Sequence, residues 1–122
     1  MLEGENYLSL ATFRRDGREV ATPIWFAGEG GALVAFSARD AGKVKRLRNS
    51  SRARFAACDA RGRVHGPWHE ASAEVITDPA AIQRALASLR AKYGWLMALT
   101  DFFSRLTGRY SNRSYLRVTP RA

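Results

Sequence analysis

The stretch Val20-Ala-Thr-Pro-Ile-Trp-Phe26 is followed at short distance by the basic segment Ser37-Ala-Arg-Asp-Ala-Gly-Lys43-Val-Lys45-Arg46-Leu-Arg48. The first stretch predicts a strand, because its side chains alternate between two faces. The second predicts a short helix over 41–49, in which Val44 and Leu47 share one face while the basic side chains point elsewhere. The other predicted elements are arranged around this strand and this helix.

Short strands dominate the rest of the chain. Asp16-Gly17 has the turn chemistry of a hairpin that joins strands 7–14 and 19–27. Asp78-Pro79 is a helix start, and an apolar stripe continues from there to Gly94. Further strands are expected at 32–37, 52–59, 65–76 and 114–119, and a further helix at 96–106. This pattern predicts one mainly β (α+β) domain over 1–122, a closed or nearly closed six-stranded antiparallel barrel with flanking helices. Periodicity alone does not separate a split barrel from another α+β meander.

Composition and charge limit the classes of partner that this chain is expected to bind. The formal net charge is +9, and the region from Arg39 to Arg54 holds seven basic residues and one acid, Asp40. Nucleic acid, a phosphorylated cofactor and an acidic membrane surface would each suit such an excess. The single cysteine, Cys58, indicates a reducing, cytoplasmic setting, and no stretch approaches the ~20 apolar residues of a membrane span. We therefore expect no membrane partner. Aromatic residues do not interleave with the basic run, so we also expect no nucleic acid partner.

The basic segment predicts a phosphate cradle. Its lysines fall in the first turn of the predicted helix, where the helix dipole disfavours cations unless an anion is bound. A helix start also presents unpaired N–H groups, so Gly42, Lys43 and Ser37 together suit a phosphate. The alternative to a phosphate site is a basic helix face that is solvated and binds no ligand.

Other groups of residues are weaker candidates for a functional site. His65 and His69 would lie about 13 Å apart on a strand, so no metal site is expected. Cys58 suits a buried core thiol better than a nucleophile, and the catalytic residues remain unknown. The apolar helix at 96–106 suits core or dimer packing better than a substrate wall. Three arginines near the C-terminus could meet an acidic cofactor tail: Arg105, Arg109 and Arg113.

Several segments together carry a family resemblance. They are Tyr7-Leu-Ser-Leu-Ala-Thr-Phe13, the two stretches quoted above, Arg52-Ala-Arg-Phe55 and Gly66-Pro-Trp-His-Glu-Ala71. From about residue 6 to 95 their order resembles the pyridoxamine 5′-phosphate oxidase-like FMN-binding split barrels. The chain is most similar to the branch of that family that depends on the deazaflavin coenzyme F420.

The resemblance implies a split barrel, a homodimer and two cofactor sites at the dimer interface. It implies that Lys43 contacts the cofactor phosphate, with Ser37 and Gly42 nearby and Lys45 or Arg46 assisting. Trp68 would approach the site, from the same subunit or from the other one. Main-chain groups of four residues would line the cofactor ring: Thr22, Pro23, Ile24 and Trp25.

The function that this resemblance implies is F420-dependent hydride transfer to or from a small organic substrate. Pyridoxamine phosphate oxidases hold their substrate with an arginine and histidine pair near the C-terminus, and this chain has no histidine there. We therefore do not expect vitamin B6 oxidation. FMN in place of F420, or a non-catalytic flavin- or haem-binding protein, are the alternatives. The cofactor carries the redox chemistry itself, so the lack of an evident catalytic side chain fits an enzyme and a binding protein equally.

Overall fold

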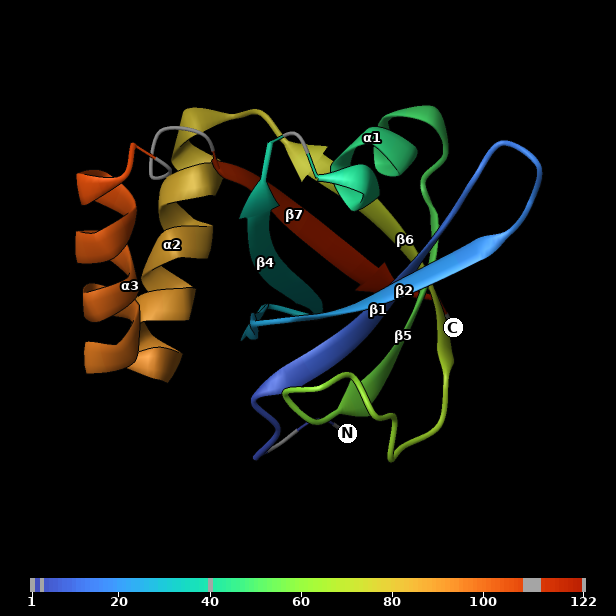
Figure 1. Ribbon diagram of the computed structural model, residues 1–122, viewed down its shortest axis with the longest axis horizontal. Helices are drawn as coiled ribbons and strands as arrows, with labels where there is room; N and C mark the ends of the chain where they lie inside the picture. The colour runs from blue at the N-terminus through green and yellow to red at the C-terminus, as the bar shows by residue number, and fades with distance from the viewer. Residues whose placement is uncertain (1, 3, 40, 109–112, 122) are drawn as a thin grey trace.

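A seven-stranded antiparallel sheet curls into a half-barrel flanked by three helices (Figure 1). The computed structural model describes residues 2, 4–39, 41–108 and 113–121. The strands follow the order β2-β1-β5-β6-β7-β4-β3 across the sheet. In chain order the elements are β1 (Tyr7–Phe13), β2 (Glu19–Ile24), β3 (Phe26–Glu29), β4 (Ala32–Ala38), α1 (Gly42–Asn49), β5 (Arg52–Cys58), β6 (His69–Ile76), α2 (Pro79–Tyr93), α3 (Trp95–Leu106) and β7 (Arg113–Pro120).

The half-barrel closes where β2 passes into β3. These two strands form the opposite edges of the sheet, yet only Trp25 separates them along the chain. The sheet must therefore curl until its edges meet, and β2 does contact β4. The predicted barrel class is confirmed, but with seven strands instead of six. The strand predicted over 19–27 divides at Trp25, which leaves the ladder and stacks on Tyr93 of α2, with ring centroids 4.5 Å apart.

Tyr93 fixes this bend through its hydroxyl group. The hydroxyl oxygen accepts the Phe26 N–H at 2.9 Å and lies 2.8 Å from the carbonyl oxygens of Phe26 and Asn6, to one of which it donates. A buried backbone amide without a hydrogen-bond partner lowers the free energy of unfolding. The Tyr93 hydroxyl therefore provides the hydrogen bond that a neighbouring strand would otherwise provide. Burial raises the pKa of Tyr93 to about 12, which keeps the hydroxyl neutral and able to donate.

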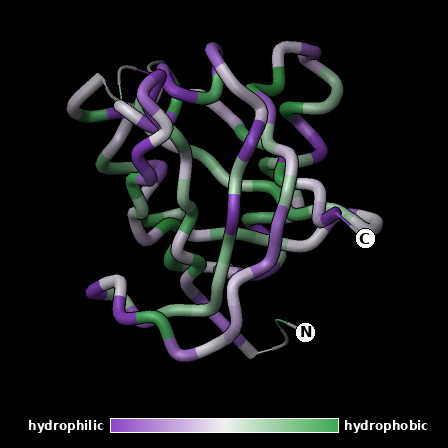
Figure 2. Tube along the Cα trace, turned by 90° about the vertical axis from the view of Figure 1, so that its right-hand side faces the viewer, coloured by the Kyte–Doolittle hydropathy of each residue, from purple (hydrophilic) through white to green (hydrophobic). Residues whose placement is uncertain are grey.

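The interior of the half-barrel is apolar because alternate residues of each strand point inward. Leu10 of β1 lies opposite Phe55 of β5, and Leu116 and Val118 of β7 complete the same core. Figure 2 shows hydrophilic and hydrophobic residues alternating along the strands that face the viewer. A second apolar layer joins the outside of the sheet to α2, through Leu86 and its neighbours.

The segment before β6 differs from the prediction. The strand expected over 65–76 begins only at His69, so Trp68 precedes the strand. Gly62, with φ of +89°, turns the chain, and the Asp59 carboxylate accepts the N–H groups of Arg61 and Arg63 at 2.9 Å each. The amides of Arg61 and Arg63 are therefore bound to a side chain, whereas the His65 amide donates to the Ala57 carbonyl of β5 at 3.0 Å. Pro67 has no N–H to offer a ladder.

Helix α3 is the outermost layer and packs against α2 (Figure 1). Its buried residues are Met97 and Asp101, and the Asp101 carboxylate accepts from Arg113 at 2.8 Å and from Arg90 at 3.1 Å. The predicted packing of its apolar side chains in the core does not occur within this chain, because most of them are exposed. Packing at a dimer contact stays a prediction. In the described part of the chain, no helix has the length and hydropathy needed to cross a bilayer.

Replacing Tyr93 with Phe tests the bend. We expect the free energy of unfolding at pH 7 to fall by about 1–3 kcal/mol, because the Phe26 amide loses its partner. The neutral hydroxyl is the form that the fold favours, so this contribution is complete below pH 10 and disappears as pH rises from 10.0 through about 12. Chemical denaturation across that range measures it. Tyr7→Phe is the control, and an equal loss in both variants would contradict the assignment.

Candidate cofactor-binding site

The site centres on Lys43 at the start of α1. Strand β4 carries Ser37 toward this helix start, and the Lys43 ammonium donates to the Ser37 hydroxyl at 3.3 Å. Val44 and Leu47 anchor the helix by pointing inward, and both are buried. The half-buried Lys43 side chain is therefore held between the end of a strand and the first turn of a helix, as predicted.

Arg46 lies about one turn further along α1 and extends toward β1. Its Nε donates to the Thr12 hydroxyl of β1 at 2.6 Å. A Cβ built on Gly42 would lie 2.7 Å from an Arg46 guanidinium nitrogen, so a side chain at position 42 would displace the flexible end of this arginine. The exposed Lys45 lies beside it. The structure thus brings together five of the predicted residues: Ser37, Gly42, Lys43, Lys45 and Arg46.

These cations lack negative partners within the part of the chain that the structure describes. No described carboxylate lies within ion-pair distance of Lys43, Lys45 or Arg46, and Asp40 lies outside the described residues. Burial, and then the nearby Arg46 charge, lower the pKa of Lys43. Burial, and then Arg14, lower the pKa of Arg46. Ala41 also provides no side-chain cap for the helix. A bound phosphate would offset these electrostatic costs.

The four residues predicted to line a ring lie on β2 and just after it. Strand β2 contacts β4, the strand that carries Ser37. Ile24 itself is buried in the core, and Trp25 faces α2. Pro23 is exposed, and Thr22 Oγ1 is buried without a hydrogen-bond partner among the described residues. A buried hydroxyl of this kind can bind a polar atom of a ligand.

Trp68 does not join the other predicted residues within one chain. It lies just before β6, and its ring packs against the Arg54 guanidinium at 5.0 Å. Arg54 in turn pairs with Glu70 on the neighbouring strand β6 and with Glu19 on β2, which lies beyond β1. A role for Trp68 in this chain's own site is therefore not supported, and its approach from a second subunit stays a prediction.

Sequence reasoning missed a basic hollow beside the helix start. It has a volume of about 460 Å³ and lies between the β1–β2 hairpin and α1, lined by Phe13, Arg14, Arg15, Asp16, Arg18, Gly42, Lys45, Arg46 and Asn49. Gly42 and Arg46 belong to both this hollow and the predicted cradle. The three hairpin arginines are visible in the sequence, but only the packing of α1 against β1 brings them to the cradle.

The C-terminal arginines do not form such a surface. Arg113 is buried, donates to Asp101 and Ser104, and packs over the Phe36 ring at 4.3 Å. It therefore has a structural role, and the prediction that it meets a cofactor tail is not supported. Arg105 lies by the groove between α2 and α3, and Arg109 lies outside the described residues.

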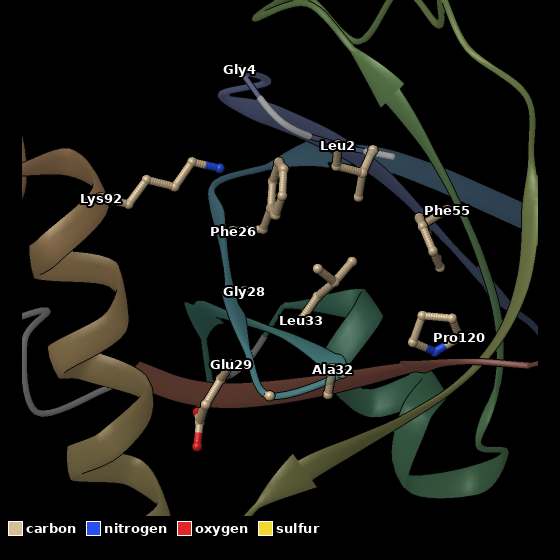
Figure 3. Close-up of a pocket in the computed structure, with 12 residues that line it drawn as sticks. Leu2, Gly4, Phe26, Gly28, Glu29, Ala32, Leu33, Phe55, Lys92 and Pro120 are labelled. Carbon is tan, nitrogen blue, oxygen red and sulfur yellow. The ribbon is translucent and has the colours of Figure 1, made fainter.

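A larger hollow, of about 540 Å³, opens at the β3–β4 turn (Figure 3). Leu2, Leu33, Phe55 and Pro120 surround it, and Lys92 reaches from α2 over the Phe26 ring, 3.4 Å from its centroid. The turn is separated from Ser37 by most of β4, which at ~3.3 Å per residue is roughly 17 Å. This hollow contains none of the predicted site residues and is distinct from the cradle.

Comparison with known proteins identifies the family. The family model described as Pyridoxamine 5′-phosphate oxidase matches residues 1–122, and the chain belongs to this family of flavin-binding split barrels. The recognition made from the sequence is thereby confirmed. No curated protein matches the sequence.

Solved structures share the fold at low sequence identity. HutZ, the heme storage protein from Vibrio cholerae, has a TM-score of 0.74 and 14% identity, covering 98% of this chain and 84% of that chain. An FAD-binding protein from Mesorhizobium loti has a TM-score of 0.65 and 17% identity, covering 99% and 83%. An F420 reductase has a TM-score of 0.56 and 20% identity, covering 99% and 90%. The fold therefore occurs in proteins with different cofactors and in a storage protein.

Replacing Lys43 with Met tests the cradle. The variant removes a half-buried cation that lies near Arg46, so we expect no loss of thermal stability without ligand. We expect affinity for inorganic phosphate to fall about tenfold, since a charge-assisted hydrogen bond is lost. The phosphate-dependent shift in melting temperature measures both effects.

Lys92→Met is the matched control, because burial also lowers the pKa of Lys92 but this lysine lies at the other hollow. If both variants responded to phosphate like the wild type, Lys43 would not be a phosphate ligand.

Proposed function

We propose that the chain is an oxidoreductase that uses coenzyme F420 for hydride transfer to or from a small organic substrate. One observation carries the choice of cofactor: the cations at the start of α1 adjoin the basic hollow, whose lining holds Arg14 and Arg15 beside Arg46, while Asp16 there is paired with Arg18. Lys43 and Arg46 suffice for a phosphate monoester. Arg14, Arg15 and Lys45 extend the positive surface beyond it, and the acidic tail of F420 would occupy that extension.

The residues of this chain fit the two parts of such a cofactor. Lys43, Ser37 and the first turn of α1 would hold the phosphate, with Arg46 fixed against Thr12 beside it. The main chain around Pro23 would line the ring. The buried hydroxyl of Thr22, which has no partner among the described residues, would bind a polar ring atom. The cofactor supplies hydride transfer when bound, so the protein needs only to orient it, position the substrate and exclude water.

Two alternatives use the same fold. FMN has a comparable ring and phosphate but no acidic tail, so it would leave the hairpin arginines without a function. Haem usually takes an axial ligand such as histidine, but His65 bonds to Glu5 at 2.7 Å and His69 packs on the Phe55 ring at 5.1 Å. Neither histidine is among the residues of the cradle. These observations favour F420 over both.

The proposal includes a homodimer with its cofactor sites at the interface, in which Trp68 of the partner subunit completes each site. Pro23 and Trp68 are both accessible on the outside of this chain. The partner would cover the ring segment on β2 and thereby exclude water from it.

Parallel titrations with F420 and FMN test the cofactor. We expect F420 to bind more tightly, and Arg14→Gln with Arg15→Gln to weaken F420 about tenfold while changing FMN affinity less than about threefold. Arg61→Gln with Arg63→Gln is the control, since it removes the same charge from another exposed turn. Binding of FMN alone would favour the flavin alternative, and binding of neither would remove the redox proposal.

Turnover separates an enzyme from a binding protein. Reduced F420 bound to the protein should be oxidised in the presence of a suitable small organic acceptor, with a rate that depends on acceptor concentration. Tight F420 binding without any change of its redox state across a broad acceptor panel would indicate storage or transport instead.

A further inference from the structure

One end of the half-barrel opens onto its apolar core (Figure 3). The hollow at the β3–β4 turn has a volume of about 540 Å³, within the range of about 300–1,000 Å³ that small-molecule sites have. Phe26 and Phe55 line it, and both belong to the buried core of the half-barrel. Leu2 and Leu33 are partly buried and pack against that core. A ligand in this hollow would therefore contact the interior of the protein as well as its surface.

A glycine at an inward-facing position of β3 leaves the hollow unfilled. Alternate residues of a strand share one face, so Gly28 faces the same side as the core residue Phe26. Its partner across the ladder is Leu33, which packs against the same core. A Cβ built on Gly28 would meet no atom within 4 Å, and the backbone there has no positive φ that would require glycine. Glycine inside a strand often marks a place where a ligand approaches the backbone.

One cation lies at this hollow. Lys92 of α2 is exposed as a whole, and its ammonium lies 3.4 Å from the centroid of the Phe26 ring. Among the described residues, which do not include Met1 and Glu3, no oxygen accepts a hydrogen bond from this ammonium and no carboxylate lies within ion-pair distance of it. Partial burial lowers the pKa of Lys92, and the Glu5 charge acts in the opposite direction. The ammonium can therefore donate to a ligand.

The acidic residues near this ammonium have other partners. Glu29, the acidic residue of the lining, pairs with Arg84 of α2 at 3.6 Å, and Figure 3 shows it pointing away from Lys92 and from the apolar side chains. The Glu5 carboxylate is bonded to His65 at 2.7 Å. The groups that face an incoming ligand are therefore apolar side chains and one ammonium. Such a surface complements a molecule with an apolar body and a single negative charge.

We propose that the hollow at the β3–β4 turn binds a small apolar carboxylate, with its apolar body against Phe26, Leu33 and Phe55 and its carboxylate on the Lys92 ammonium. A charge-assisted hydrogen bond fixes one end of the ligand, and burial of the apolar body provides most of the affinity. Inorganic phosphate has no apolar part, so it does not suit this hollow. The inference goes beyond the proposed function, because the hollow contains none of the cradle residues.

Calorimetric titration of the full chain without cofactor tests the proposal. Butanoate, hexanoate and octanoate are the probes, and octylammonium has an alkyl chain of similar length with the opposite charge. We expect one octanoate per chain, and roughly threefold tighter binding for each CH₂ group added to the carboxylate, because each added group is buried in the hollow. Octanoate should bind at least about tenfold more tightly than octylammonium.

Lys92→Met tests the cation while keeping a side chain of similar length. We expect the affinity for octanoate to fall about tenfold, whereas Lys92→Arg, which keeps the positive charge, should stay within about threefold of the wild type. Arg48→Met is the matched control, because Arg48 is an exposed cation of α1 that lies outside this hollow.

Gly28→Val tests the hollow itself. The valine side chain would occupy free space and suits a strand, so the melting temperature should be maintained or raised while the affinity for octanoate falls at least about tenfold. Lys43→Met should leave the affinity for octanoate within about threefold of the wild type, which separates this site from the cradle.

Three results would overturn the proposal. The first is no binding of octanoate to the full chain, which would assign the hollow to the N-terminal residues or to a second copy. The second is binding that does not depend on chain length, which would assign it to the general positive charge of the protein. The third is wild-type affinity for octanoate in both Lys92→Met and Gly28→Val. These titrations contain no F420, so a failure of this proposal is distinguishable from a failure of the cofactor proposal.

Discussion

The hydroxyl group of Tyr93 holds the bend at which the chain passes from one edge of the sheet to the other. Strand β2 can lead directly into β3 because the Phe26 amide, at the start of this edge strand, finds a partner on α2. Trp25 stacks on the same tyrosine and completes the contact. Helix α2 therefore serves less as a cover for the sheet than as the support that keeps its two edges together.

This closure has a direct consequence for the site. It brings β2 against β4, which carries Ser37, the residue that Lys43 of α1 contacts. The segment suited to a ring and the groups suited to a phosphate thereby face one region. Among the described residues, the cations there donate hydrogen bonds to hydroxyl groups and not to carboxylates. Lys43 donates to Ser37, and Arg46 donates to Thr12. A bound anion would offset the unfavourable electrostatics at this helix start, which is why we propose a phosphate there.

Local signals in the sequence predicted most of the elements. Asp16-Gly17 gave the first hairpin, and Asp78 caps α2 by accepting the Ala81 N–H at 3.1 Å. The division at Trp25 was missed because its cause, Tyr93, lies 67 residues beyond Phe26. The late start of β6 was missed because Trp68 has strand-like neighbours, whereas the turn at Gly62 and its bonds to Asp59 decide the path of the chain.

In the candidate site, too, local sequence signals predicted some features, while contacts between distant residues determined the others. Lys43 and Ser37 were predicted to lie together because they are close in sequence and because the position of a lysine in a first helical turn is itself informative. The hairpin arginines were not found, since nothing local connects Arg14 with Arg46. Only the packing of α1 onto β1 joins them, and that contact depends on the curl of the whole sheet. Features that require distant strands to meet were beyond the reach of a local pattern.

A crystal structure of the chain grown with F420 tests the central claim most directly. The account predicts the cofactor phosphate within hydrogen-bond distance, about 2.7–3.2 Å, of the Lys43 ammonium and the Ser37 hydroxyl, with the ring along Thr22 to Trp25 and the tail toward Arg14. A phosphate bound at the β3–β4 turn beside Lys92, or a ring placed away from β2, would contradict it.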